Sequence, residues 1–210
     1  MEPQQIREKG ILAKLLEKGI KILLRKECKK IDKVRVDIEA SSIQIINGII
    51  QKINIIAEEI NYKNLLFDKI ELEANKIKIN FNISNKELEF KNEPKIKFKI
   101  SLSDSSIKKI LLSGNWSWIR NKITTEILNK AQLEDIKITN NQLLITASKN
   151  KENINEEEIF YLKAEKGKIY LGNKVHKKSI IIPTEDKVYV ENVTIKNNLI
   201  ILCANSSISF

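Results

Sequence analysis

Residues 41–60, SSIQIINGIIQKINIIAEEI, place the pair Asn47-Gly48 in the middle of a run of isoleucines. Asn-Gly is the strongest short signal for a two-residue β-hairpin turn, because both residues tolerate a positive φ. A hairpin centred on this pair would set Asp37 directly opposite Glu58. Two like charges in that position destabilise a pair of strands.

The same residues also fit a single helical turn. In this reading Ser42 caps the turn and Gly48 ends it in the left-handed conformation that glycine adopts at low cost. A strand then begins at Ile49. The hairpin would join the flanking strands directly, whereas the helical turn would separate them.

Apolar and polar side chains alternate on both sides of this stretch, as is typical of half-buried strands. The alternation covers residues 33–40, 53–57, 70–74, 77–83 and 96–102. Between Ala74 and Ile77 the apolar residues change from even-numbered to odd-numbered positions. A β-bulge at Asn75 and Lys76 would keep both apolar sets on one face of an antiparallel meander.

Two segments show the 3.6-residue period of amphipathic helices instead. The first covers residues 3–30, and the second covers residues 101–132, where Ser103 or Ser105 can act as the N-cap. Residues 113–115 are expected to break or kink the second helix.

The second half returns to strands. Residues 135–147 and 192–204 match at a constant offset of 57, and each has Asn-Asn between two alternating runs. Asn tolerates the positive φ of a tight turn, so both segments predict hairpins. They are either a repeated hairpin or a true duplicated unit. Residues 149–158 are expected to form a charged loop or connector.

These patterns predict an α+β fold in a single domain of residues 1–210, with helix plus meander in residues 1–102 and again in residues 103–210. An extended, curved antiparallel sheet has one apolar face. The long N-terminal helix and the central helical segment are expected to cover that face.

The sequence has no constellation of catalytic or metal-binding residues. His176 is the only histidine, which excludes a Ser-His-Asp triad and a multi-histidine metal site, and we expect it on a solvated loop. Cys28 and Cys203 lack a CxxC spacing, and no glycine-rich phosphate loop occurs. The acidic runs at residues 58–59 and 156–158 are not arranged as paired catalytic carboxylates. We expect no enzyme activity and no cofactor.

The chain carries a formal net charge of +10, and residues 1–35 hold eleven basic against five acidic residues, which accounts for six of the ten charges. Aromatic residues make up only 6% of the chain, and no stacking platform for nucleic-acid bases is visible. The charge alone supports non-specific nucleic-acid binding at most. The positive charge is also compatible with binding to an anionic membrane surface.

No secretory signal or membrane-spanning run is visible, because charged residues interrupt the apolar positions near the N-terminus. We therefore expect a cytoplasmic protein that associates peripherally with a membrane.

The N-terminal helix supplies most of the candidate contacts with lipid or membrane. The apolar candidates are Ile11, Leu12, Leu15, Leu16, Ile20, Leu23, Trp116 and Trp118, and the candidates for anionic headgroups are Lys14, Lys18, Lys21 and Arg25. The alternative is that the apolar side of the helix lies on the protein's own sheet. For the two tryptophans, one is expected in the core and the other as an exposed anchor, because positions two apart on a helix do not share a face.

The order of elements resembles the LmeA-like phospholipid-binding family of bacterial domains, which has many cyanobacterial members. The resemblance rests on residues 41–81: a small residue, a short apolar run ending in Gly48, an alternating strand, a turn, and a strand that runs on into a second apolar set. Residues 100–123 look like the family's central segment of strand then helix. The resemblance favours the helical turn at residues 42–48 over the hairpin.

The resemblance implies a fold similar to the tubular lipid-binding domains, in which helices lie against a curved sheet and leave an apolar groove. It implies non-catalytic binding of phospholipid acyl chains by a membrane-associated protein. The alternative hypothesis is a scaffold with a filled core that binds an unknown protein partner. A non-specific nucleic-acid binder is the third.

Overall fold

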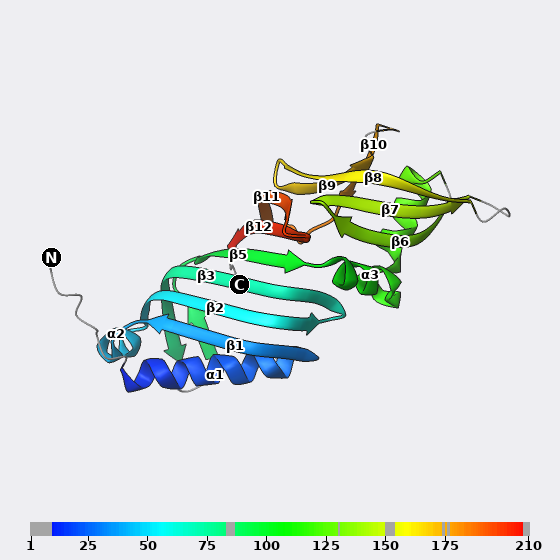
Figure 1. Ribbon diagram of the computed structural model, residues 1–210. Helices are drawn as coiled ribbons and strands as arrows, with labels where there is room; N and C mark the ends of the chain where they lie inside the picture. Colours follow the sequence, from blue (N-terminus) through cyan, green and yellow to red (C-terminus); the bar gives the residue numbers. More distant parts are fainter. Residues whose placement is uncertain are drawn as a thin grey trace, which may run out of the picture.

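The computed structural model describes residues 10–82, 87–129, 131–149, 154–173, 175 and 177–207. The expected helical residues 3–9 and the expected loop residue His176 lie outside these ranges. The chain folds into two antiparallel sheets with helices packed against them (Figure 1), which confirms the predicted α+β class.

The helices are α1 (Ile11–Glu27), α2 (Ser42–Ile46), α3 (Asp104–Leu112) and α4 (Ser117–Lys122), with a 3₁₀ turn η1 (Gly114–Trp116) and a π-helical turn η2 (Ile123–Ile127). The strands are β1 (Lys30–Glu39), β2 (Ile49–Tyr62), β3 (Leu65–Asn82), β4 (Glu87–Phe90), β5 (Lys95–Leu102), β6 (Gln132–Thr139), β7 (Gln142–Lys149), β8 (Ile154–Glu165), β9 (Lys168–Asn173), β10 (Lys178–Ile182), β11 (Val188–Lys196) and β12 (Leu199–Ser207).

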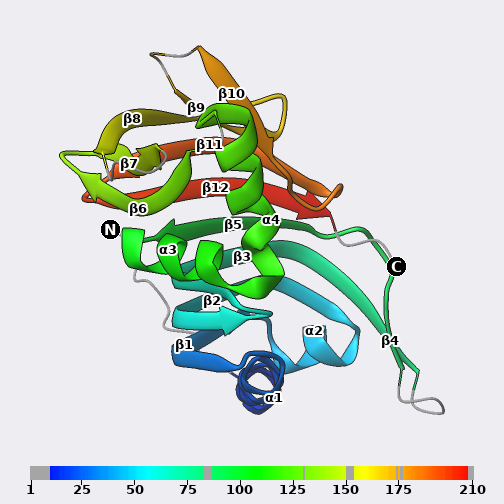
Figure 2. The ribbon, with the colours of Figure 1, turned by 90° about the vertical axis from the view of Figure 1, so that its right-hand side faces the viewer.

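The first sheet has the order β1-β2-β3-β5-β12-β11, and β4 pairs with β3 beside it; the second sheet has the order β10-β9-β8-β7-β6. The C-terminal hairpin therefore returns to the first sheet, where Ile200 of β12 lies opposite Leu102 of β5. Figures 1 and 2 both show β11 and β12 between the rest of the first sheet and the second sheet.

The stretch around Asn47-Gly48 forms the helical turn, and the hairpin reading is wrong. Ser41, one residue earlier than expected, caps α2: its Oγ accepts from Gln44 N at 3.2 Å, and the Gln44 side chain accepts from Ser41 N at 2.9 Å. This reciprocal capping box satisfies two backbone donors that a helix start otherwise leaves free. Asp37 pairs with Asn54, and Glu58 lies opposite Asp32 instead, where Lys33 Nζ is 2.6 Å from the Glu58 carboxylate.

The predicted change of phase in the third strand is confirmed. Lys76 has a φ of +53°, and Ala74 and Ile77 are buried in the same apolar cluster. The expected bulge at Asn75 and Lys76 is absent, because Lys52 pairs with Asn75 and Ile50 with Ile77 in one unbroken register. Strands β2 and β3 both contribute apolar side chains to the cluster beneath α1.

The two Asn-Asn hairpins are also confirmed. Asn140 and Asn141 join β6 to β7, Asn197 and Asn198 join β11 to β12, and all four have φ between 50° and 57°. The charged connector was predicted too long, because residues 156–158 lie within β8 and pair with β7. Backbone hydrogen bonds extend the ladder there whatever the charge of the side chains.

Helix α1 covers the β1–β3 end of the first sheet. Ala13 is fully buried in a cluster with Val36 and Ile38 of β1, and Leu16 and Ile20 pack against the same cluster. A second and larger apolar cluster lies between the two sheets and contains Leu111, Ile123, Ile145, Phe160 and Val193 among its members.

Candidate functional site

An apolar cavity of about 210 Å³ lies in the larger core, bounded by both sheets and by the central helical segment. Its lining is Leu65, Phe67, Leu102, Ile107, Ile110, Leu111, Ile119, Ile123, Ile136, Leu143, Ile145, Leu162, Ile169, Leu171, Ile182, Val193, Ile200 and Leu202. All of these side chains are aliphatic or Phe. A cavity without polar groups holds no ordered water, so its natural occupant is an apolar group.

The volume limits what can enter. A cavity of roughly 150 Å³ with a similar lining takes up benzene, whereas pockets for whole drug-sized ligands measure about 300–1,000 Å³. At about 210 Å³ the cavity accommodates part of one hydrocarbon chain and excludes a complete two-chain lipid. The remainder of such a ligand would have to lie outside it.

The central helical segment forms one wall of the cavity, and Figure 2 shows this segment in front of the two sheets. Ile107, Ile110 and Leu111 come from α3, Ile119 comes from α4 and Ile123 from η2. Ile110 and Leu111 follow Ile107 by three and four residues, and Ile123 follows Ile119 by four, so each group lies on one side of its own helical segment. The predicted break is present, because η1 separates α3 from α4 after Ser113.

Two sets of polar contacts fix the start of α3. Ser103, one of the two expected caps, accepts from Ser106 N at 3.3 Å. Its own backbone N and hydroxyl donate to the Asp68 carboxylate on β3 at 2.6 and 3.0 Å. These contacts join the cap of α3 to the first sheet.

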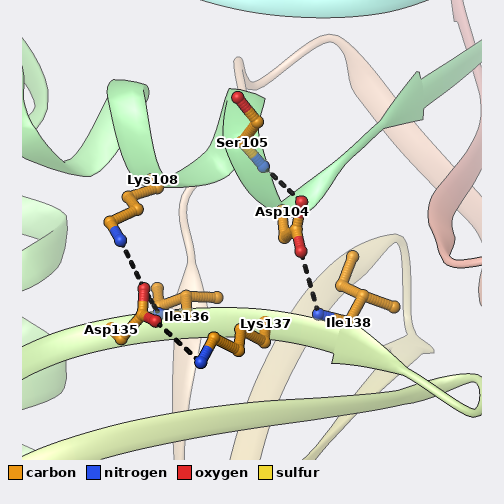
Figure 3. Close-up of polar contacts among 7 residues, drawn as sticks. All are labelled: Asp104, Ser105, Lys108, Asp135, Ile136, Lys137 and Ile138. Atoms are coloured by element: carbon orange, nitrogen blue, oxygen red, sulfur yellow. Dashed lines mark hydrogen bonds and ion pairs between the residues drawn. The ribbon is translucent and has the colours of Figure 1, made fainter.

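The second set joins α3 to β6 (Figure 3). Lys108 Nζ lies 2.5 Å from Asp135 Oδ1, Lys137 Nζ lies 3.3 Å from Asp135 Oδ2, and Asp104 Oδ2 accepts from Ile138 N at 3.5 Å. The hydrogen bond from Lys108 is the largest cause that lowers the pKa of Asp135. The carboxylate is therefore ionised at neutral pH and holds α3 over the second sheet.

The end of this wall is fixed by a tryptophan. Trp116 Nε1 donates to the carbonyl oxygen of Lys63, in the turn between β2 and β3, at 3.2 Å. The Trp116 and Trp118 rings lie 6.4 Å apart, although the two positions were not expected to share a face. They meet because Trp116 belongs to a 3₁₀ turn and only Trp118 to α4. Trp116 is half-buried and Trp118 is 40% exposed.

Three half-buried lining residues lie close in sequence to the contact between Trp116 and Lys63: Leu65 and Phe67 follow the Lys63 turn, and Ile119 follows Trp118. The lining residues Leu102, Ile107, Leu162, Ile182 and Leu202 are half-buried as well. Beside the turn, Lys63 Nζ lies 5.2 Å from the centre of the Tyr62 ring. Amphipathic aromatic side chains with adjacent basic groups are typical of a boundary between water and lipid.

The candidate contacts on α1 divide into two groups. Ile11, Leu15 and Leu23 are exposed, while Leu12, Leu16 and Ile20 are half-buried. Leu16 and Ile20 pack on the sheet and are not free to contact a membrane. Of the headgroup candidates, Lys14, Lys18 and Arg25 are exposed and Lys21 is half-buried.

Sequence reasoning did not single out the cavity lining. The only signal in the sequence is apolar alternation, which is the same for a filled core and for a core with a void. The candidate membrane contacts predicted from the sequence also did not include Ile22, Ile43 and Ile46, which are exposed on α1 and α2. The helical period of α1 placed Ile22 among the apolar positions but did not indicate which of them face the sheet.

A larger hollow of about 800 Å³ lies on the opposite, polar side of the first sheet. Glu73 there is 2.7 Å from Lys52, and Glu71 is 2.8 Å from Lys69. These hydrogen-bonded lysines lower the pKa of both carboxyl groups. Paired, solvated charges of both signs on a sheet surface give no directed binding site.

In the part of the chain that the structure describes, no three His, Cys, Asp or Glu side chains gather in a way that could hold a metal ion. Cys28 and Cys203 are free and half-buried. Burial, and secondarily the Glu27 carboxylate, raise the pKa of the Cys28 thiol, which keeps it protonated at neutral pH. None of the described helices combines the length and the apolar character needed to cross a membrane.

Residues 8–173 match the model of a family described as LmeA-like phospholipid-binding. The match covers most of the chain, including α1, the central helical segment and β9, and it confirms the resemblance seen around residues 41–81. No curated protein and no solved structure matches the chain.

Proposed function

The chain belongs to the LmeA-like phospholipid-binding family, and from this premise we propose that it binds phospholipid without catalysis and associates peripherally with a membrane. Part of one acyl chain enters the cavity between the two sheets. We place the other parts of the lipid outside the cavity, at the surface beside Trp116. The cavity lined only by apolar side chains is the observation that carries this proposal.

The size of the cavity sets the expected strength of binding. If about 150 Å³ holds the six carbons of benzene, the cavity holds roughly eight carbons of an acyl chain. At about 0.8 kcal/mol for each buried CH₂, this contributes roughly 6 kcal/mol relative to water, before the cost of association is subtracted. The same carbons are already shielded from water in a bilayer, so the cavity gains little over a membrane, which favours a protein that exchanges lipid with a membrane over one that holds it permanently.

The cavity also bears on the alternative of a protein-binding scaffold. That alternative requires a filled core, because its function would rest on the outer surface alone. An internal void costs stability, since the surrounding side chains lose packing contacts. A void between otherwise well-packed sheets is easier to account for if a ligand fills it.

The experiment compares two substitutions of half-buried leucines that pack on the same core cluster. Leu162 lines the cavity and Leu133 does not. Both proteins are purified without detergent, and extracted phospholipid is measured by mass spectrometry per mole of protein. We expect Leu162→Trp to lose most of the lipid that the wild type carries, and Leu133→Trp to keep it.

A wild-type protein that carries no phospholipid and takes none up from vesicles would contradict the proposal. Equal lipid content in the two variants would place the lipid elsewhere. Thermal unfolding of both variants controls for loss of the fold, because overpacking costs about 1–3 kcal/mol at either position.

A further inference from the structure

Helix α1 has a second apolar stripe that faces away from the sheet. Ile11, Leu15 and Ile22 are four and seven residues apart, which places them within about 40° on a helix that turns by 100° per residue. Together with Leu23 they are between 57% and 76% exposed. The opposite side of the helix, around Ala13, packs on the buried apolar residues of the sheet.

Helix α2 extends this stripe. It lies beside the N-terminal end of α1 (Figure 1), where a Cβ on Gly10 would be only 2.5 Å from Ser42 Oγ. Its side chains Ile43 and Ile46 are 72% and 74% exposed. Six large apolar side chains are thus presented to solvent on two adjacent helices, an arrangement that marks an interaction surface.

The charges around the stripe are basic. Lys14, Lys18, Arg25 and Lys26 are exposed on α1. Of the two acids of this helix, Glu17 turns toward the sheet, where its Oε1 accepts from Ile38 N at 2.9 Å, and only Glu27 is exposed. The outer side of α1 therefore combines apolar side chains with an excess of positive charge.

We propose that the outer faces of α1 and α2 form the surface that docks this protein on an anionic membrane. A helix with apolar side chains flanked by Lys and Arg lies in the plane of the bilayer interface, with its apolar groups in the acyl region and its cations among the headgroups. A second copy of the chain would bring like charges together, and lysine is depleted in the cores of protein interfaces. Both facts favour a lipid surface.

This inference rests on the proposed peripheral association with a membrane, and it assigns the membrane contact to helices that do not line the cavity. The test measures co-sedimentation of the full chain with vesicles of phosphatidylcholine, alone or mixed with phosphatidylglycerol. The variant Leu15→Ser/Ile22→Ser is expected to bind the mixed vesicles about tenfold or more weakly than the wild type. The matched control Ile159→Ser/Val175→Ser removes exposed apolar side chains from the second sheet region and is expected to bind normally.

The electrostatic part is tested with Lys14→Gln/Lys18→Gln. This variant is expected to lose affinity for the mixed vesicles severalfold at low salt and to differ little from the wild type at high salt. Its control, Lys168→Gln/Lys196→Gln, removes the same charge from exposed positions on β9 and β11. The wild type is expected to bind phosphatidylcholine alone only weakly.

Unchanged vesicle binding by Leu15→Ser/Ile22→Ser would overturn the proposal, as would equal binding to neutral and anionic vesicles. A lipid-free wild type that dimerises in analytical ultracentrifugation, and a serine variant that does not, would assign the face to self-association instead. Leu162→Trp separates the two claims: it is expected to lose carried lipid while it still binds vesicles. If the proposal of lipid binding in the cavity fails, the result on membrane docking therefore still stands.

Discussion

Gly48 occupies a position that only glycine fits. Its φ is +69°, its carbonyl accepts from Ile79 N at 2.8 Å, and a Cβ there would lie 2.0 Å from Ile79 O. The residue ends α2 and at the same time brings the chain against the backbone of β3. The side chain is excluded by both the backbone conformation and the neighbouring strand.

Replacement of Gly48 by Ala is therefore expected to destabilise the protein by about 2 kcal/mol or more, since the left-handed conformation alone costs roughly 1–2 kcal/mol. Gly19→Ala provides the opposite control. Gly19 lies inside α1 with no atom within 4 Å of its would-be Cβ, so the change is expected to stabilise by about 0.5–1 kcal/mol. Urea unfolding of both variants measures the difference, and equal effects would contradict this account of Gly48.

Local signals at single residues were largely readable from the sequence. The Asn-Asn turns, the Ser103 cap and the helical stop at Gly48 each depend on backbone conformation over a few residues. The cap of α2 was placed one residue late, because Ser41 and Ser42 are chemically equal and only Gln44, three residues after Ser41, distinguishes them.

At the scale of elements, the contact between α3 and β6 rests on Asp135. Its carboxylate receives Lys108 from the helix and Lys137 from its own strand. Because these contacts lower its pKa in the folded state, the stabilisation is fully present above the pKa in the unfolded chain, about 3.9. It is lost as the pH falls through the lower pKa of the folded protein.

Asp135→Asn is accordingly expected to cost about 0.5–1 kcal/mol near neutral pH, and progressively less as the pH falls below the ordinary pKa of aspartate, about 3.9. The free energy of unfolding of wild type and variant is measured by urea denaturation across this pH range. A cost that does not shrink in acid would mean that the carboxylate charge is not what holds α3 against β6.

Helix α1 illustrates what periodicity leaves open at this scale. The sequence indicated one amphipathic helix, with membrane contact and core packing as alternatives. The structure gives the helix two apolar sides, one buried on β1 and one exposed. Ala13 is the fully buried residue of α1, and a hydrophobicity pattern gives little weight to so small a side chain.

At the scale of the whole molecule, the cavity is a product of topology. Strand β12 returns to pair with β5, and β11 pairs with β12 at the edge of the first sheet. Their side chains Val193, Ile200 and Leu202 form the wall that faces Leu143 and Ile145 of the second sheet. The sequence predicted a groove between helices and one extended sheet. It did not indicate the return of the last hairpin, because all the isoleucine-rich strands offer a similar apolar face and long-range pairing chooses among them.

The central claim is that an acyl chain occupies this cavity, and intermolecular NOE measurements test it most directly. A protein with protonated isoleucine and leucine methyl groups in a deuterated background is loaded with protonated phospholipid. We expect NOEs from acyl CH₂ groups to the methyl groups of Ile145 and Leu171, which line the cavity, and none to Ile38 and Ile50, which are buried beneath α1. Acyl NOEs that reach only exposed methyl groups such as Leu15 and Ile22, with none at Ile145 or Leu171, would contradict the claim.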